Sequence, residues 1–317
     1  MGKSFEKLNY STRPNKNVER KLIAQLLGLL GSKGYFDVKS YQYIGFGSIW
    51  FTDFSLIHRV IGIKDMTSVE KESSREQRLR FNKPFECITL VLREYSDALA
   101  DLDWQKRSVV WLDYDDILKP GMFDDLKRTI SKVVSGSVVL VSVNADAQQL
   151  QHVKQEDQEL SEAEALRLVV GSENLPADHE KRLGRAKFPS LVGDILDGAF
   201  KTNTTTSRAD LEFVPLLSVT YADGVPMVTY GGIFLNPADL VEFNKLPLQT
   251  LDFPVGSQQF ELAVPNLTPK EKMRFDQLLP RSEMPTSKDL GFELRENEIK
   301  AYVKFYLHYP VYGEYQF

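Results

Sequence analysis

Residues 41–52 read YQYIGFGSIWFT, and the interpretation of the whole chain depends on the turn that they contain. An apolar, aromatic run ends at Gly45, a second glycine follows at Gly47, and residues 48–62 have the apolar spacing of a helix. Glycine lets a backbone approach a ligand closely, and the first amides of a helix attract anionic groups. The stretch is therefore either a nucleotide-binding turn or a strand end whose glycines only permit tight packing.

Apolar, strand-like segments alternate with helical segments from about residue 40 to residue 145. The strand-like segments are apolar along their whole length, which is typical of a parallel sheet covered by helices on both faces. Residues 213–236 form two β-rich runs that meet at Asp223-Gly224, a strong hairpin signal. The pattern predicts an α/β, Rossmann-like fold whose parallel sheet ends in an antiparallel hairpin. The expected parallel strands are residues 41–45, 65–70, 86–92, 108–113 and 137–144.

The chain divides into three regions by composition. Residues 1–39 read as an N-terminal arm and a helix over 17–31, and residues 40–244 contain the sheet. Residues 146–187 are rich in polar and charged residues, and they predict an exposed helical insertion. Prolines become frequent from about residue 245, so residues 245–317 are expected to form a small helical or winged-helix-like module. Its predicted helices are residues 267–279 and 295–310.

The bulk composition limits the possible functions. The chain has 317 residues, 42% of them hydrophobic, and a net charge of −5, so it lacks the global positive field typical of nucleic-acid-binding proteins. The single cysteine, Cys87, cannot form an internal disulfide, and no run approaches the roughly 20 apolar residues that cross a bilayer. We expect a cytoplasmic protein.

An acidic residue supports the nucleotide-binding interpretation of the turn. Glu70 ends the second predicted strand, at the roughly 20-residue offset expected of a carboxylate that holds ribose hydroxyls. Trp50 stands where a dinucleotide fingerprint has its third glycine, and no Gly-Lys-Ser/Thr sequence follows the turn. These features argue against a dinucleotide cofactor and against a P-loop.

The turn, Glu70, the acid at Asp113 and the hairpin together resemble the class I S-adenosylmethionine (SAM)-dependent methyltransferases, over about residues 40–236. The chain is similar to proteins labelled "putative O-methyltransferases" that carry a small C-terminal module, among them the three-Cys-motif partner proteins. The resemblance implies SAM as cofactor, with the turn at its methionine part, Glu70 at its ribose and the residues after strand three near its adenine. Tyr43 lies where the family usually has an acidic residue. The implied cofactor-binding residues are Tyr43, Gly45, Gly47, Ser48, Glu70, Ser96 and Asp97.

The sequence Asp113-Tyr114-Asp115-Asp116 follows the fourth predicted strand. Open α/β sheets place their working residues at such strand ends, and a carboxylate beside an aromatic ring can orient an amine or a hydroxyl. Asp113 and Tyr114 are therefore the catalytic candidates. The alternative is that these carboxylates only cap the next helix.

Oxygen ligands for a metal are also expected at this edge. Asn144 and Asp146 follow the fifth strand and should lie near Asp113. Such a set suits Mg²⁺, and metal-dependent catechol-type O-methyltransferases resemble it, so these three residues are weak metal candidates.

Residues 12–21, TRPNKNVERK, are basic and precede the glycine turn. One interpretation is a solvated, partly flexible arm. The other is a lid whose Arg13 and Lys16 meet an anionic substrate or ligand.

Three functions remain open on these grounds. The first is SAM-dependent methyl transfer to an oxygen or nitrogen acceptor. The second is a catalytically degenerate module that works with an operon-encoded protein partner, for instance in bacterial defence. The third is a nucleic-acid methyltransferase, in which Arg13, Lys16, Arg20 and the C-terminal module hold the substrate. The aromatic residues near the C-terminus would then stack on bases instead of packing in a core.

Overall fold

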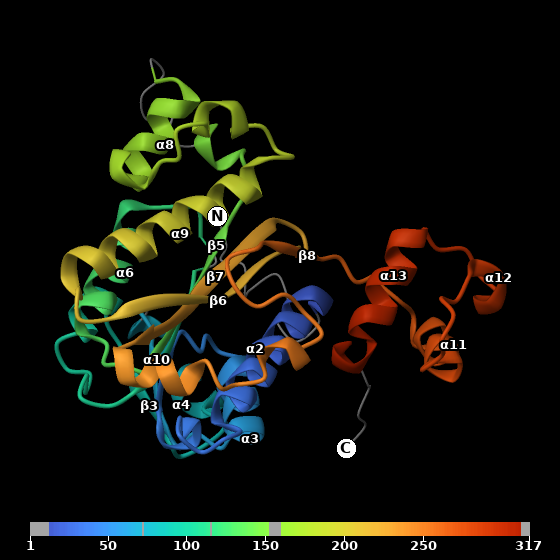
Figure 1. The fold of residues 1–317 in the computed structure, drawn as a ribbon, viewed down its shortest axis with the longest axis horizontal. Coiled ribbons are helices and arrows are strands. Elements are labelled where there is room, and N and C mark those ends of the chain that lie inside the picture. The colour runs from blue at the N-terminus through green and yellow to red at the C-terminus, as the bar shows by residue number, and fades with distance from the viewer. Residues whose placement is uncertain (1–12, 72, 115, 152–159, 312–317) are drawn as a thin grey trace.

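The computed structural model describes residues 13–71, 73–114, 116–151 and 160–311, and its centre is a single eight-stranded sheet (Figure 1). The strands are β1 (Gln42–Gly45), β2 (Asp65–Val69), β3 (Ile88–Val91), β4 (Ser108–Asp113), β5 (Val138–Asn144), β6 (Glu212–Ala222), β7 (Pro226–Leu235) and β8 (Phe260–Leu262). They lie in the order β3-β2-β1-β4-β5-β7-β6-β8. Strands β1 to β5 are parallel, and β7 is antiparallel to both β5 and β6. The predicted parallel sheet with a closing hairpin is therefore confirmed.

Strand β8 was not predicted. It pairs in parallel with β6, so that Thr220 lies opposite Glu261. Three residues are too few for an alternating pattern to stand out in a proline-rich stretch. The sheet thus continues to Leu262, beyond the boundary expected near residue 245.

Helices cover both faces of the sheet, as strands that are apolar along their whole length require. Within the described residues the α-helices are α2 (Pro14–Gly31), α3 (Thr52–Ile61), α4 (Glu76–Asn82), α5 (Tyr95–Ala98), α6 (Pro120–Lys132), α8 (Glu162–Val170), α9 (Phe188–Ser207), α10 (Pro237–Phe243), α11 (Pro269–Leu278), α12 (Ser287–Leu290) and α13 (Glu296–Phe305). Figure 1 shows α6 and α9 over one face, and α2 and α3 over the other. Within the described residues, no helix is both long and apolar enough to cross a membrane.

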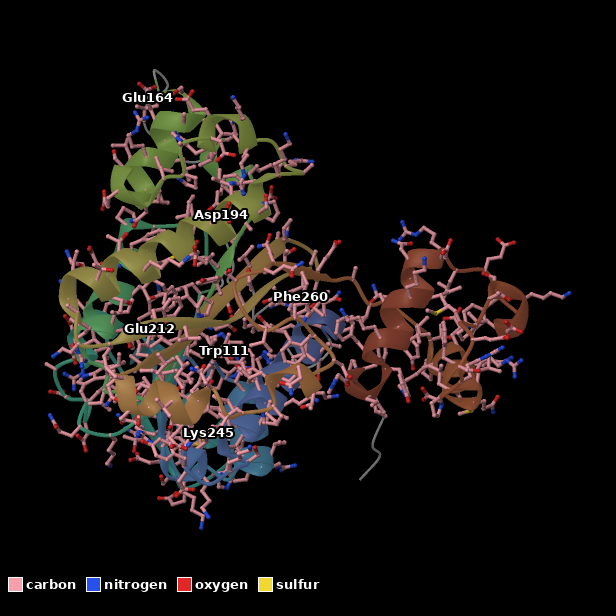
Figure 2. All side chains as sticks on the ribbon, viewed as in Figure 1. Trp111, Glu164, Asp194, Glu212, Lys245 and Phe260 are labelled. Atoms are coloured by element: carbon pink, nitrogen blue, oxygen red, sulfur yellow. The ribbon has the colours of Figure 1, made fainter. Side chains whose placement is uncertain are left out.

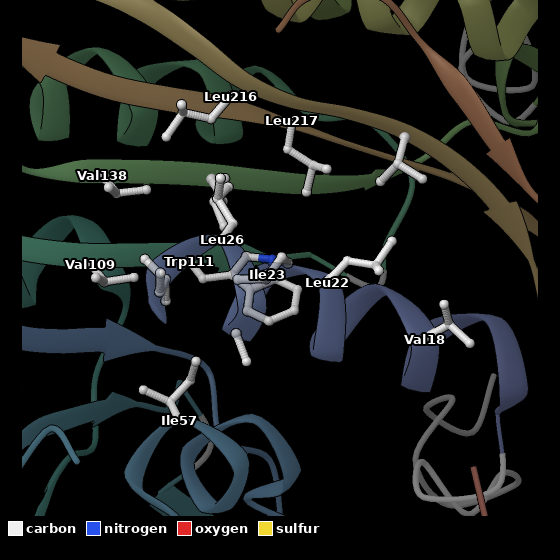
Figure 3. Packing of buried hydrophobic residues seen from close by; sticks show 14 of the residues in the cluster. Val18, Leu22, Ile23, Leu26, Ile57, Val109, Trp111, Val138, Leu216 and Leu217 are labelled. Carbon is white, nitrogen blue, oxygen red and sulfur yellow. The ribbon is translucent and has the colours of Figure 1, made fainter. Parts of the chain in front are cut away.

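The central strand β4 divides its side chains between two hydrophobic clusters. Val109 and Trp111 pack with α2 and α3, whereas Val110 and Leu112 pack with α6 and α9. Figure 3 shows Trp111 against α2, beside Ile23. Apolar contacts fill most of both faces, so we expect functional side chains at the ends of the strands, where open α/β sheets place them.

Helix α2 begins at Pro14, three residues before the predicted start, and its first turn is buried. Lys16, Glu19 and Arg20 are each at most 3% exposed. The expectation of a solvated arm is therefore wrong from Arg13 onward. The reason is that Asp113 of β4 pairs with Lys16 and Asp53 of α3 pairs with Arg20, and a charge pattern along the sequence cannot reveal these partners.

The polar insertion is helical, but its apolar side is covered. Leu166 and Val169 of α8 join the hydrophobic cluster under α6 and α9. Ser161 and Glu164 form a capping box at the start of α8. The insertion is thus helical and anchored by its apolar side, while many of its other residues are exposed. Residues 152–159 lie outside the described part of the chain.

The C-terminal module consists of α11, α12 and α13. Between residues 263 and 311 the described chain contains no strand, so the helical alternative fits and the β-hairpin of a winged helix is not seen there. Figure 2 shows Phe260 of β8 between this module and the main body. Lys304 of α13 places its Nζ atom 5.7 Å from the centre of the Phe260 ring, which links the two parts.

The aromatic residues of the last predicted helix are packing residues. Tyr302, Phe305 and Tyr309 are buried in the cluster that continues from α2. Helix α13 ends at Phe305 and a 3-10 turn, Tyr306–His308, follows, so the helix is shorter than predicted. These three rings therefore pack in the core and are not available to stack on bases. The remaining aromatic candidates, Tyr312, Tyr315 and Phe317, lie outside the described residues.

Candidate functional site

The glycine turn and Glu70 meet at the C-terminal ends of β1 and β2. The backbone amide of Ser48 donates a hydrogen bond to Glu70 Oε1 at 2.7 Å. The amide of Gly47 donates to Ser68 Oγ at 3.0 Å, and Ser68 Oγ in turn donates to Glu70 Oε1 at 3.2 Å. The predicted acid therefore lies directly beside the predicted turn.

Packing behind the turn explains both glycines. A Cβ atom at Gly47 would lie 2.6 Å from the ring of Phe51 and 2.7 Å from Ser68 Oγ, which is closer than real Cβ contacts. At Gly45 it would lie 3.2 Å from Trp111 O and from Tyr43 Oη. The turn can therefore keep its shape only with glycine at position 47, whether or not a ligand is bound.

The helix after the turn begins later than predicted. Helix α3 starts at Thr52, and Ser48 and Phe51 have left-handed φ angles of 49° and 46°. Such angles are costly for side chains larger than glycine, and here the burial of Phe51 offsets the strain. The amides of Gly47 and Ser48, and not those of a helix beginning at residue 48, therefore face Ser68 and Glu70.

Tyr43 lies beneath the turn. Its ring is buried and meets Phe54 edge-on, with the ring centres 4.8 Å apart. Burial, followed by the charges of Asp53 and Asp113, raises the pKa of the Tyr43 hydroxyl well above its usual range. Tyr43 thus supports the turn from below as a neutral group.

Asp113 is bound by a lysine from α2. Lys16 Nζ lies 2.6 Å from Asp113 Oδ1 and 2.8 Å from Glu19 Oε2. The same ammonium lies over the faces of two aromatic rings, 4.6 Å from the centre of Trp111 and 5.6 Å from that of Tyr221. Asp113 and Lys16, predicted separately as a catalytic and a substrate residue, therefore form one buried ion pair.

Hydrogen bonds extend this cluster across three strands. Trp111 Nε1 donates to Ser142 Oγ at 2.9 Å, and the hydroxyls of Ser142 and Thr229 lie 2.6 Å apart. Thr229 Oγ1 donates to Glu19 Oε1. Helix α2 is thereby fixed to β4, β5 and β7 at the edge where Asp113 emerges.

The protonation states of Lys16, Asp113 and Glu19 depend on one another. Burial alone would lower the pKa of Lys16, but Asp113 and Glu19 raise it above its usual range. Burial alone would raise the pKa of Asp113, but Lys16 lowers it below its usual range. Burial raises the pKa of Glu19, and Lys16 counteracts this effect. Near neutral pH, Lys16 is therefore protonated and Asp113 is ionised.

The sequence interpretation did not include Glu19, Thr229 or Tyr221. A usable signal existed for Glu19, since Lys16, Glu19 and Ile23 recur at the spacing of one helix face. No comparable signal exists for Thr229 and Tyr221, because their neighbours in the cluster are far away in the chain.

The ring of Tyr114 lies beside the turn, but its hydroxyl is already engaged. Tyr114 meets Phe46 with the ring centres 5.2 Å apart, and its hydroxyl donates to Asp125 Oδ2 of α6 at 2.7 Å. Burial and the Asp125 charge raise the pKa of Tyr114 well above its usual range. Tyr114 therefore serves as a wall next to Asp113, and its catalytic role stays a prediction.

Ser96 and Asp97 lie on α5, beyond the same aromatic wall. Their neighbour Tyr95 meets Phe46 edge-on, with the ring centres 5.8 Å apart. This contact connects α5 to the glycine turn, although Asp97 itself is exposed. The predicted contact of Ser96 and Asp97 with the adenine stays a prediction.

The weak magnesium candidates are engaged in other interactions. Asp113 Oδ1 holds Lys16, and Asn144 Oδ1 accepts the backbone amide of Asp146 at 2.8 Å. In the part of the chain that the structure describes, no three His, Cys, Asp or Glu side chains are grouped so that they could hold a metal ion. The described geometry therefore offers no support for a magnesium site.

Arg13 lies at the start of α2 beside Asp223 of the β6–β7 turn, with 3.8 Å between Arg13 Nε and Asp223 Oδ2. Asp223 also accepts the backbone amides of Asn15 at 3.2 Å and Lys16 at 2.8 Å. The β6–β7 turn thus caps α2 and positions Lys16 opposite Asp113.

A Thr229→Val variant tests whether the cluster depends on its hydroxyl bridge. The change leaves Ser142 and Glu19 with unsatisfied buried groups, so we expect a loss of about 1–3 kcal/mol in the free energy of unfolding, measured in urea. Thr220→Val, on the neighbouring strand and outside the cluster, is the control and should change little. Equal losses in both variants would contradict a specific role of the bridge.

The strand order, the turn after β1 and the acid after β2 define a Rossmann-like methyltransferase fold. The chain belongs to the family described as "Putative O-methyltransferase", whose model matches residues 8–317. This membership identifies it as a methyltransferase. No curated relative matches the sequence.

Three of the solved structures similar to this chain were determined with a bound cofactor. The first is the O-methyltransferase TomG from Streptomyces achromogenes in complex with SAM, which is 14% identical in sequence. The match covers 69% of this chain and 79% of the TomG chain, with a TM-score of 0.38. Trm1 from Pyrococcus horikoshii, with S-adenosyl-L-methionine, is 12% identical with coverages of 77% and 60% and a TM-score of 0.42. Cofactor-bound Rv0187 from MTB is 12% identical with coverages of 66% and 78% and a TM-score of 0.38.

Proposed function

We propose that this protein binds SAM at the C-terminal ends of β1, β2 and β4 and transfers its methyl group to an acceptor beside Asp113. The observation that carries the proposal is the hydrogen bond of 2.7 Å between the Ser48 amide and Glu70, with Asp113 at the end of the adjacent strand. It joins the turn and the acid that a nucleoside cofactor needs at the edge where open α/β sheets bind ligands.

The residues present suit SAM by their chemistry. The glycine turn would face the methionine part, and the Glu70 carboxylate would accept hydrogen bonds from the ribose hydroxyls. Ser96 and Asp97 would lie near the adenine. When bound, SAM supplies a methyl group on a positively charged sulfur, which an acceptor nucleophile attacks in line.

Asp113 and Lys16 act on the acceptor side of the site. Asp113 is ionised and partly exposed, so its carboxylate can accept a hydrogen bond from the acceptor. Asp113 also fixes the position of the Lys16 ammonium, whose charge acts on the acceptor. Lys16 is held protonated by its two carboxylate partners, so it contributes a positive charge and not a general base.

Isothermal titration calorimetry with S-adenosylhomocysteine tests the cofactor site. We expect binding to the wild type and a loss of affinity of about tenfold or more in Glu70→Gln, because the ribose loses its charged acceptor. Glu76→Gln, which changes an exposed glutamate of α4 that pairs with Arg80, is the matched control and should bind normally. Absence of binding to the wild type would refute the proposed function.

The remaining functional expectations stay predictions. They are the operon-encoded partner of a degenerate module, the nucleic-acid acceptor gripped by Arg13, Lys16, Arg20 and the C-terminal module, and the cytoplasmic location. Arg20 pairs with Asp53 and is buried, which gives it a structural role in α2 before any role in substrate binding.

A further inference from the structure

Trp50 is a large aromatic residue that faces solvent within the glycine turn. It is 40% exposed, whereas Trp104 and Trp111 are 9% and 1% exposed. Within the described residues its indole ring meets no other ring and no cation, and its Nε1–H makes no hydrogen bond. Single exposed apolar side chains are common on protein surfaces, so the exposure gains meaning only from the position of Trp50.

The side chains of the turn point in three directions. The ring of Phe46 meets Tyr114, with the ring centres 5.2 Å apart, and both belong to the side of the sheet that α6 covers. Ile49 is buried in the other hydrophobic cluster, with α2 and α3. Trp50 comes next in the chain and belongs to neither cluster. Its indole ring is therefore available to a ligand that binds at the turn.

Backbone strain holds Trp50 in this exposed position. Ser48 and Phe51 flank Ile49 and Trp50, and within the described residues no other non-glycine residue has a positive φ angle. Strained angles of this kind concentrate at ligand sites, where the surrounding structure maintains them. Here the buried ring of Phe51 and its amide, which donates to Gly47 O at 2.7 Å, fix the turn from below. The displayed tryptophan is therefore built into the turn.

Hydrogen bonds tie the same turn to the acid of the proposed cofactor site. The backbone amide of Trp50 donates to Ser48 Oγ at 3.3 Å, and the amide of Ser48 donates to Glu70 Oε1 at 2.7 Å. Glu70 follows β2, which lies on one side of β1, whereas Asp113 ends β4 on the other side. The turn is thus anchored on the side of Glu70, where the ribose is assigned.

We infer that Trp50 is a cover residue of the cofactor site and that its indole ring packs over the nucleoside half of the bound cofactor. This inference rests on the proposed function and adds a contact that the glycine turn and Glu70 do not supply. Adenine and indole are both flat π-systems, which stack without any need for directional polar groups. A ring placed over the nucleoside also keeps water away from the Glu70 carboxylate, which strengthens its hydrogen bonds.

Quenching of tryptophan fluorescence by acrylamide tests the inference without a methyl acceptor. Because Trp104 and Trp111 are buried, Trp50 should account for most of the quenching in the free protein. We expect saturating S-adenosylhomocysteine to lower the quenching constant of the wild type to about that of Trp50→Phe. An unchanged constant in protein that calorimetry shows to be saturated would overturn the inference and leave the cofactor site standing. Absence of binding in calorimetry would instead refute the proposed function.

The two halves of the cofactor, used as separate probes, test which half Trp50 covers. Adenosine should protect the wild type from acrylamide, because it contains both the ribose and the flat base. Methionine at the same concentration should not protect, since it contains neither. Protection by methionine and not by adenosine would overturn the assignment to the nucleoside.

Affinity measurements test the contact by substitution. Trp50→Ala should weaken the binding of S-adenosylhomocysteine about tenfold, because a base loses its stacking partner, and Trp50→Phe should retain most of the affinity. The Tm of both variants should match that of the wild type, since the indole ring packs against no other ring in the described structure.

Phe81→Ala is the matched control for these variants. Phe81 is 89% exposed and lies in the last turn of α4, just before the chain leads to the start of β3. Its removal takes away an exposed aromatic ring of similar kind and should leave the affinity unchanged. Normal affinity in Trp50→Ala, or an equal loss in Phe81→Ala, would overturn the role of Trp50 as a cover.

Discussion

Replacing Lys16 with methionine is expected to lower the free energy of unfolding by about 3–5 kcal/mol, because it leaves the buried carboxylate of Glu19 and the largely buried carboxylate of Asp113 without their shared cation. Both oxygens that Lys16 binds lie within 2.8 Å of its ammonium, and the side chain is 1% exposed. Methionine keeps most of the volume, so the loss reports charge and not a cavity. Urea unfolding at neutral pH measures it.

The control is Lys39→Met, an exposed lysine whose nearest carboxylate is 3.9 Å away, and it should change stability little. Adding Glu19→Gln and Asp113→Asn to Lys16→Met should recover part of the loss, since the unpaired charges are then removed. A loss in Lys16→Met no larger than in the control would contradict a buried ion pair.

The effect of Lys16→Met should also depend on pH. Because the folded protein holds the pKa of Asp113 below its unfolded value of about 3.9, the pair stabilises the fold above that pH and the contribution is lost as pH falls through the folded pKa. In the variant, protonation of the buried carboxylates becomes favourable at acid pH. The difference in unfolding free energy between wild type and variant should therefore be smaller near pH 4 than near pH 7. A difference that does not vary with pH would argue against Asp113 as the titrating partner.

The second large effect is expected from Gly47→Ala, which should reduce the affinity for S-adenosylhomocysteine at least about tenfold and destabilise the fold by about 1–3 kcal/mol. The new Cβ atom would overlap the ring of Phe51 and Ser68 Oγ. Ser68 also holds Glu70, so the strain is transmitted to the residue assigned to the ribose. Calorimetry and thermal unfolding measure the two effects.

Gly121→Ala provides the matched control for this change. Gly121 lies in the first turn of α6, and apart from its chain neighbours and its own helix backbone no atom lies within 4 Å of an added Cβ, so alanine should be tolerated there without loss of binding. Normal cofactor affinity in Gly47→Ala would show that the shape of the turn does not govern binding.

Much of the fold could be predicted from local patterns. Strands β1 to β5 are apolar along their length and separated by helices, so their parallel arrangement follows from burial on both faces. Asp223-Gly224 marked the hairpin of β6 and β7 because a tight turn needs those residue types. Glu70 was placed beside the glycine turn because strand ends of a parallel sheet share one edge.

Other features could not be predicted, because they depend on contacts between distant parts of the chain. Strand β8 is too short for a periodic signal and exists only through its pairing with β6. The start of α3 was misplaced because an amphipathic pattern does not show that Ser48 and Phe51 take left-handed angles.

The residues YQYIGFGSIWFT form a strand, a turn that requires glycine, and the first residue of a helix. Their composition made the cofactor turn recognisable, since glycine, apolar runs and turns are local properties of a chain. The partner of Asp113 is Lys16, 97 residues earlier, and such a pair forms only when the sheet brings α2 and β4 together. Lys16, which the sequence shows only as part of a basic segment, is therefore a buried cation beside the candidate acceptor site. The free energy of a buried charge depends on its three-dimensional surroundings and not on its neighbours in the chain.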